Sequence, residues 1–110
     1  MIDYGEMIFI GVSGDKYRFL AYPLDAVFAK VGAAFMVMNR KLSREYHPNY
    51  TRVFVGQTGD LSAGFGTHPR SDCFARYAAN CVCIYLEEQE SSRLTIARDL
   101  VENYHPPCNE

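Results

Sequence analysis

Tryptophan is missing from this chain of 110 residues, and no apolar run approaches the roughly 20 residues that a membrane-spanning helix needs. The amino-terminal residues are acidic rather than basic, so the sequence predicts no secretory signal peptide. Internal repeats, low-complexity stretches and linkers are also missing, which predicts a single domain over residues 1–110. Together these absences predict a cytoplasmic protein with no membrane contact.

An excess of basic residues is lacking as well. The chain has 11 Lys and Arg against 13 Asp and Glu, for a formal net charge of −2. Proteins dedicated to nucleic acids are more often basic, because Lys and Arg supply most of their non-specific affinity for phosphate. The balance therefore favours a protein partner, while a nucleic-acid partner stays open through a local basic patch. Nothing in the composition predicts an oligomeric state.

Cysteine is present four times, and a cytoplasmic location predicts that all four are reduced thiols. Cys81 and Cys83 alternate within an apolar run, so both should point to the same face of a strand. A structural metal site would need two further ligands at close spacing, whereas Cys108 and His105 are distant in sequence. We expect buried structural cysteines and no metal site.

The pattern of apolar and turn-forming residues predicts an α+β domain with a small, mostly antiparallel sheet flanked by helices. Strands are expected at residues 7–10, 17–22, 32–38, 51–55 and 82–86. Between the third and fourth strands, the polar stretch 39–50 is expected to be an exposed loop. Short helices are expected from a cap at Asp60 to about His68, and over residues 71–79.

The last helix has the clearest pattern. It should start near Ser91 or Ser92 and be ended by Pro106 and Pro107. The positions expected to face the core follow a three-four spacing and are Leu94, Ala97, Leu100, Val101 and Tyr104.

Three segments resemble parts of the GIY-YIG nuclease domains and follow the same order along the chain. Residues 32–35 stand where the Gly-Ile-Tyr strand of that family would be. The second motif of the family is matched by Phe54-Val55-Gly56-Gln57-Thr58-Gly59-Asp60-Leu61 followed by His68. Residues 93–109 resemble the family's final helix and its tail containing Pro and Asn. The resemblance covers residues 32–110 and leaves 1–31 as an extra N-terminal β-hairpin.

The resemblance implies a catalytic set that this chain lacks. The family uses two Tyr, one Arg and a metal-binding Glu, which act on the attacking water, the phosphoryl charge and a divalent cation. These positions fall on Phe35, Phe54, Gly64 and Ala97. Framing residues of the family remain at Asp60, His68 and Asn109, among others. The resemblance thus implies the fold without its catalytic residues, and no cofactor or metal.

Neighbouring residues offer poor substitutes for the missing Glu. Asp99 lies two positions from Ala97, roughly 200° round the helix axis, and should face solvent. Arg93 lies one turn earlier on nearly the same face, where it would repel a cation and could hold an anion instead. Glu102 is also badly placed.

Candidate contacts to nucleic acid are six basic residues outside the N-terminal hairpin. The set is Arg40, Lys41, Arg44, Arg70, Arg76 and Arg93. Each has the alternative of being a solvated surface residue. His68 is interpreted as a hydrogen-bonded packing residue in preference to a phosphate ligand.

The leading hypothesis from sequence is a catalytically inactive GIY-YIG-like domain reused as a binding or inhibitory module for a protein partner. The alternative is a weakly active or atypical endonuclease, with Mg²⁺ or Mn²⁺ recruited through Asp60, His68 or Glu102. A third hypothesis is a small-anion binder that uses Arg93. Whether the chain is an enzyme is left open, with the preference against it.

Overall fold

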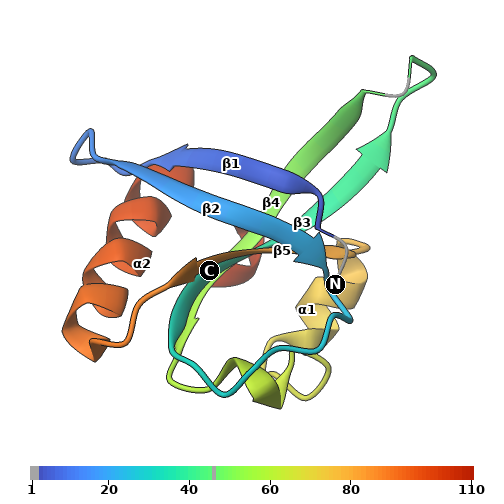
Figure 1. Cartoon of the computed structure of the whole chain (residues 1–110). Coiled ribbons are helices and arrows are strands. Elements are labelled where there is room, and N and C mark those ends of the chain that lie inside the picture. Colours follow the sequence, from blue (N-terminus) through green and yellow to red (C-terminus); the bar gives the residue numbers. More distant parts are fainter. Residues whose placement is uncertain (1–2, 46) are drawn as a thin grey trace.

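The computed structural model describes residues 3–45 and 47–110, which form one curled five-stranded sheet with two α-helices (Figure 1). Within these residues, neighbouring strands pair in antiparallel fashion, and the spatial order is β1-β2-β5-β3-β4. The strands are β1 Gly5–Ile10, β2 Lys16–Pro23, β3 Ala33–Leu42, β4 Pro48–Thr58 and β5 Cys81–Leu86. The predicted α+β class and antiparallel sheet are confirmed. No helix in the described part of the chain is long and apolar enough to cross a membrane.

The N-terminal hairpin is an integral part of the sheet. β1 pairs with β2, and β2 pairs with β5 from Leu20 opposite Ile84 to Pro23 opposite Cys81. The tight turn between the two strands includes Gly14 at φ +92°, a backbone angle that L side chains rarely adopt. Residues outside the family resemblance therefore supply two of the five strands.

The sheet is covered on both faces, which explains the uninterrupted apolar run of β3. Alternate residues of this strand enter two separate cores: Ala34, Met36 and Met38 enter one, and Ala33, Phe35 and Val37 the other. The first core includes Ile96 and Leu100 of α2 (Glu90–Tyr104), and the second includes Phe74 of α1 (Ser71–Arg76). A strand buried on both faces reads as a continuous apolar segment rather than an alternating one.

The predicted last helix is confirmed as α2, but its buried face differs in part from the prediction. Arg93, Ile96 and Leu100 are buried, whereas Leu94 is 46% exposed. The helix ends at Tyr104, and the next residue, His105, adopts a left-handed backbone at φ 47°, directly before Pro106. The burial of Arg93 places the inward stripe one residue earlier than the apolar spacing suggested.

The two short helices are shorter than predicted. Asp60 does cap a helix by accepting from the backbone N–H of Ser62, but that helix is the single 3₁₀ turn η1, Leu61–Ala63. It stops at Gly64, whose φ of +70° breaks the helical path well before His68. α1 ends at Arg76 rather than residue 79, and no side chain caps its start.

Most of the stretch 39–50 is strand, so the prediction of a loop was wrong for residues 39–42 and 48–50. β3 and β4 continue their pairing through Arg40 opposite Tyr50 and out to Leu42 opposite Pro48. The resulting two-stranded ribbon projects from the body of the molecule (Figure 1). Arg40 donates from Nε to the Tyr50 hydroxyl at 3.1 Å and lies over the Tyr4 ring. Polar residues suit this ribbon because it projects beyond the covered part of the sheet.

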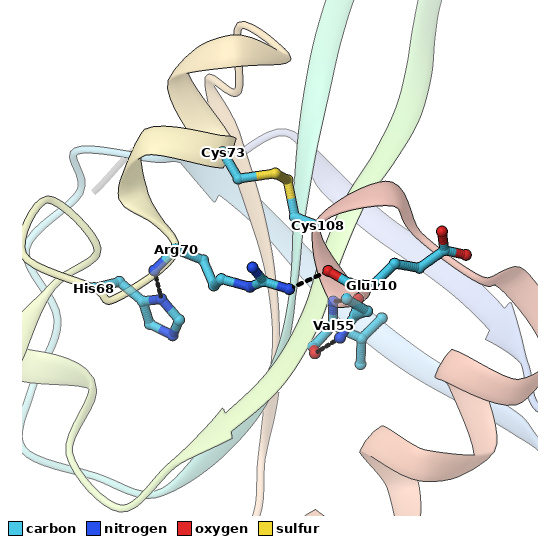
Figure 2. Close-up of a disulfide and its surroundings, with 7 residues drawn as sticks. Val55, His68, Arg70, Cys73, Cys108 and Glu110 are labelled. Atoms are coloured by element: carbon cyan, nitrogen blue, oxygen red, sulfur yellow. Dashed lines mark hydrogen bonds between the residues drawn. A yellow bond between two sulfur atoms is a disulfide. The ribbon is translucent and has the colours of Figure 1, made fainter.

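Two of the four cysteines form a disulfide, which corrects the prediction of four reduced thiols. Cys73 of α1 bonds to Cys108 in the C-terminal 3₁₀ turn η2, Pro107–Asn109 (Figure 2). The prediction assumed a reducing compartment and could not foresee that the fold brings these residues to a Cα–Cα distance of 5.9 Å. Cys81 and Cys83 are free and buried on the same face of β5, as predicted.

Side chains from the C-terminal segment close the outer edges of the sheet. The Asn109 amide donates to Val55 O and accepts from Val55 N, both at 2.8 Å, as a neighbouring strand would. At the other edge, the Ile10 N–H donates to the Tyr104 hydroxyl, and Asn103 Nδ2 donates to Ile10 O. These contacts satisfy backbone groups that an edge strand otherwise leaves unpaired.

Asp99 anchors the N-terminal hairpin to α2, which corrects the expectation that it faces solvent. Its carboxylate accepts from Ser13 N at 2.9 Å, from the Ser13 hydroxyl at 2.6 Å and from the Tyr17 hydroxyl at 2.7 Å. A Cβ on Gly11 would lie 1.8 Å from Asp99 Oδ2, so this approach requires glycine. The hydrogen bonds from Ser13 and then Tyr17 lower the pKa of Asp99, while burial and then Asp99 raise the pKa of Tyr17 to about 12.

We expect Asp99→Asn to lower the free energy of unfolding at neutral pH. We also expect the free energy of unfolding of this variant to change less than that of the wild type as the pH is lowered. A carboxyl whose folded pKa is depressed contributes fully above its unfolded pKa, near 3.8 here, and this contribution is lost as pH falls through the folded pKa. Urea titrations at pH 7 and at successively lower pH should therefore show the two proteins converging in acid. Asp25→Asn, an exposed aspartate, is the matched control. A difference in free energy of unfolding between wild type and Asp99→Asn that stays constant down to pH 2 would contradict the role given to the Asp99 carboxylate.

Candidate functional site

Aromatic rings from three segments meet on the α1 face of the sheet. Phe35 of β3 and Phe54 of β4 have ring centroids 6.0 Å apart, and the His68 ring lies 5.2 Å from Phe54 and 6.0 Å from Phe35. Phe74 of α1 lies 5.2 Å from His68, and Phe65 lies 4.9 Å from Phe35. The two positions at which the family resemblance expects tyrosine are therefore packed into a phenylalanine-rich cluster.

Gly56 makes this packing possible. It lies opposite Phe35 in the β3–β4 ladder, and a Cβ at this position would come 2.7 Å from Phe54 Cε2 and 2.8 Å from Phe35 Cζ. Both distances are well inside van der Waals contact. The glycine of the family motif is thus used here to let two phenylalanine rings approach the backbone of β4.

His68 is held in one orientation by the chain that follows it. Its Nδ1 accepts from the backbone N–H of Arg70 at 3.0 Å, so the neutral ring carries its proton on Nε2 (Figure 2). Burial, followed by the charge of Arg70, lowers the pKa of His68 below its usual 6.5. The imidazole is therefore neutral at pH 7, which agrees with its interpretation as a hydrogen-bonded packing residue.

A small cleft of about 240 Å³ opens beside this aromatic cluster. Phe35 and His68 line one part of it, and Gly64 lies where the family resemblance expects arginine. The Asp60 carboxylate at the rim accepts from the Ser62 backbone and hydroxyl through Oδ1, and the Ser62 hydrogen bond lowers the pKa of Asp60. The carboxylate serves as a helix cap, with Gln57 as its polar neighbour in the cleft wall.

The structure does not bring Ala97 to this cleft. Ala97 packs against the core on the α2 face, whereas Phe35 and Phe54 belong to the core on the opposite face of the sheet. Three of the four positions at which the resemblance expects catalytic residues, with Asp60 and His68, therefore share one region, and the fourth lies elsewhere. Asn109 lies apart from the cleft, at the β4 edge that it closes.

Arg93 is a structural residue in this fold. Its side chain is almost fully buried, and its Nε donates to Gln57 Oε1 at 2.9 Å. Nη1 donates to the carbonyl oxygens of Glu87 at 3.1 Å and Glu88 at 2.8 Å. A Cβ on Gly32 would lie 2.5 Å from Nη1, so the chain is fitted closely round the guanidinium. These bonds leave the anion-binding interpretation of Arg93 without support.

The remaining basic candidates do not form one surface. Arg40, Lys41 and Arg44 lie on the projecting β3–β4 ribbon, whereas Arg70 and Arg76 lie at the two ends of α1. Arg70 donates from Nη2 to the Glu110 carbonyl at 2.5 Å, next to the disulfide (Figure 2). It ties the C-terminal tail to α1.

A larger groove was not foreseen from the sequence. It encloses about 620 Å³ between the N-terminal segment, the residues after β2, the loop before α1, and α1 itself. Pro23, Leu24 and Phe74 give it an apolar wall, Asp25 and Asn80 are among its polar residues, and Phe65 lines both this groove and the cleft. Its lining comes from distant stretches of sequence with no shared pattern, so no local signal could have revealed it.

Among the side chains of residues 3–45 and 47–110, no group of three or more His, Cys, Asp or Glu is positioned to hold a metal ion. Comparisons of the chain with models of protein families, with curated proteins and with solved structures find no match.

Proposed function

We propose that this chain is a GIY-YIG-like domain without nuclease activity, used as a binding or inhibitory module for a protein partner. The observation that carries the proposal is the lack of catalytic polar groups in and beside the cleft. Phe35 and Phe54 pack against His68 without a hydroxyl, and Gly64 offers no guanidinium. Such a cleft has apolar contact to offer and little to stabilise charge on a phosphate.

Two further features support a protein as the partner. The neighbouring apolar groove is large enough to take side chains of another protein, and Phe65 lines both this groove and the cleft. The acidic formal charge of −2 would also oppose non-specific attachment to nucleic acid. We place the contact surface at the groove, with Ala75 of α1 on its wall.

A photocrosslinking amino acid placed at Ala75, in cells that naturally make the protein, tests this proposal. The exposed Leu94 on α2, which covers the other face of the sheet, is the matched control position. We expect a discrete protein adduct from position 75 that is absent from position 94. Adducts to nucleic acid alone, or the same adducts from both positions, would overturn it.

A second candidate, nucleic-acid binding without cleavage, is favoured by the charge of the ribbon. Residues 40–52 contain four of the 11 Lys and Arg but one of the 13 Asp and Glu. Two-stranded ribbons are among the elements that proteins place in nucleic-acid grooves. On this candidate, reversing the charge of the exposed Lys41 and Arg44 would weaken binding to duplex DNA and flatten its dependence on salt.

A further inference from the structure

A cluster of sulfur atoms lies in the core on the α2 face, away from the aromatic cleft. The Cys83 Sγ is 3.5 Å from Met38 Sδ and 3.7 Å from Met7 Sδ. Cys81 lies two residues earlier on the same face of β5 and in the same core, as the strand partner of Met38. Neither cysteine is in a disulfide, and both are fully buried. One thiol and two thioethers are thus in contact, with a second thiol beside them on the same face of the sheet.

The sheet register explains how this cluster arises. Cys81 and Cys83 alternate on β5 and share a face, and Met38 is the β3 partner of Cys81. Met7 comes from β1, two strands away from β5. Ala21, the β2 partner of Cys83, is small enough to let the long Met7 side chain lie across β2. The donors are held by three strands of one rigid sheet.

We propose that this cluster, formed by Cys81, Cys83, Met7 and Met38, is a binding site for a single Cu(I) ion. Thiolate and thioether are soft ligands, and a set that includes methionine selects Cu(I) over harder cations. Metal–sulfur bonds of about 2.3 Å place neighbouring sulfurs of a tetrahedral site about 3.8 Å apart. The separations of 3.5 and 3.7 Å to the Cys83 sulfur are close to that spacing.

The binding step involves no change of oxidation state. Cu(I) forms a bond to each cysteine sulfur, each thiol releases one proton to water, and the two thioethers donate lone pairs without losing a proton. The site then carries one negative charge. Met7 is half-buried on the edge strand β1, whereas Met38 and both cysteines are fully buried, so the ion would enter past Met7.

The test is an anaerobic titration of the disulfide-intact protein with Cu(I), in competition with a coloured Cu(I) chelator. Ascorbate keeps the copper reduced without cleaving the Cys73–Cys108 bond. We expect one ion per chain, a rise in the unfolding temperature as the ion binds the folded state, and an X-ray absorption spectrum with sulfur neighbours only. Zn²⁺ at the same concentration is the control and should give a smaller rise.

Variants that keep the core volume identify the ligands. Met7→Leu and Met38→Leu replace a thioether by a side chain of similar size, so the fold should tolerate them. Each is expected to weaken Cu(I) binding by at least about tenfold, a loss that even outer-shell changes can produce. Met36→Leu, from the next same-face position of β3, is the matched control and should bind as wild type does.

Two results would overturn the proposal. One is a wild-type protein that binds no Cu(I) against the chelator, or whose absorption spectrum shows nitrogen or oxygen neighbours. The other is a Met7→Leu/Met38→Leu protein that binds Cu(I) as tightly as Met36→Leu, which would mean that the thioethers are core packing.

Discussion

Arg93→Ala is expected to lower the free energy of unfolding by about 3 kcal/mol, because it removes a buried guanidinium that makes three hydrogen bonds. The guanidinium serves Gln57 Oε1 and two backbone carbonyls that precede α2, at 2.8 to 3.1 Å. Hydrogen bonds to charged groups contribute more than neutral ones, and the loss of three of them at one buried side chain accounts for an effect of this size. The same hydrogen bonds connect the start of α2 to the end of β4, so Arg93→Ala should destabilise both elements.

The measurement is a urea unfolding curve followed by circular dichroism, with ΔG extrapolated to water. Arg98→Ala, from an exposed position of the same helix, is the matched control and should change stability by less than about 0.5 kcal/mol. Arg93→Lys should fall between Ala and wild type, because an ammonium keeps the charge but lacks the planar fork. Equal stability of Arg93→Ala and Arg98→Ala would contradict the structural role given to Arg93.

Removal of the disulfide is expected to cost a similar amount. Cys73 and Cys108 are separated by 35 residues, and closing a loop of that length restricts the unfolded chain by about 3–4 kcal/mol in the chain-entropy account. The bond also holds the tail that carries Asn109, which closes the β4 edge at Val55. Reduction should therefore loosen this edge before the rest of the sheet.

Unfolding curves with and without a dithiol reductant check this prediction. The wild-type protein should lose about 3–4 kcal/mol on reduction, whereas Cys73→Ser/Cys108→Ser should start at the lower value and ignore the reductant. Hydrogen exchange at the Val55 amide gives the local readout. A reductant effect that persists in the double variant would contradict the assignment, since Cys81 and Cys83 are free thiols.

The order of the strands along the chain and the identity of α2 could be predicted because their signals are local. β3 and β5 are short apolar runs, and Pro106 marks the end of the last helix directly. The projecting ribbon was missed because its strands extend beyond the covered sheet and have no buried face to impose an alternation of apolar and polar residues. Cross-strand pairs such as Arg40 with Tyr50 cannot be recognised without knowing the register.

The candidate site could be predicted only in part, for the same reason. The motif around Gly56 placed Phe54, Asp60 and His68 in one region, because these residues lie close together in the sequence. The separation of Ala97 from them depends on which face of the sheet α2 covers, and helical spacing does not contain that information. Arg93 appeared to be a ligand candidate because its carbonyl and amide acceptors lie in other segments.

The most direct test of the central claim is a cleavage assay with labelled single-stranded DNA, duplex DNA and a structured RNA, with Mg²⁺ or Mn²⁺ and with chelator. The account predicts that every substrate stays intact in all conditions, for wild type and for His68→Ala alike. Metal-dependent cleavage that co-purifies with the wild-type protein and disappears in His68→Ala would contradict it and establish the chain as an active nuclease.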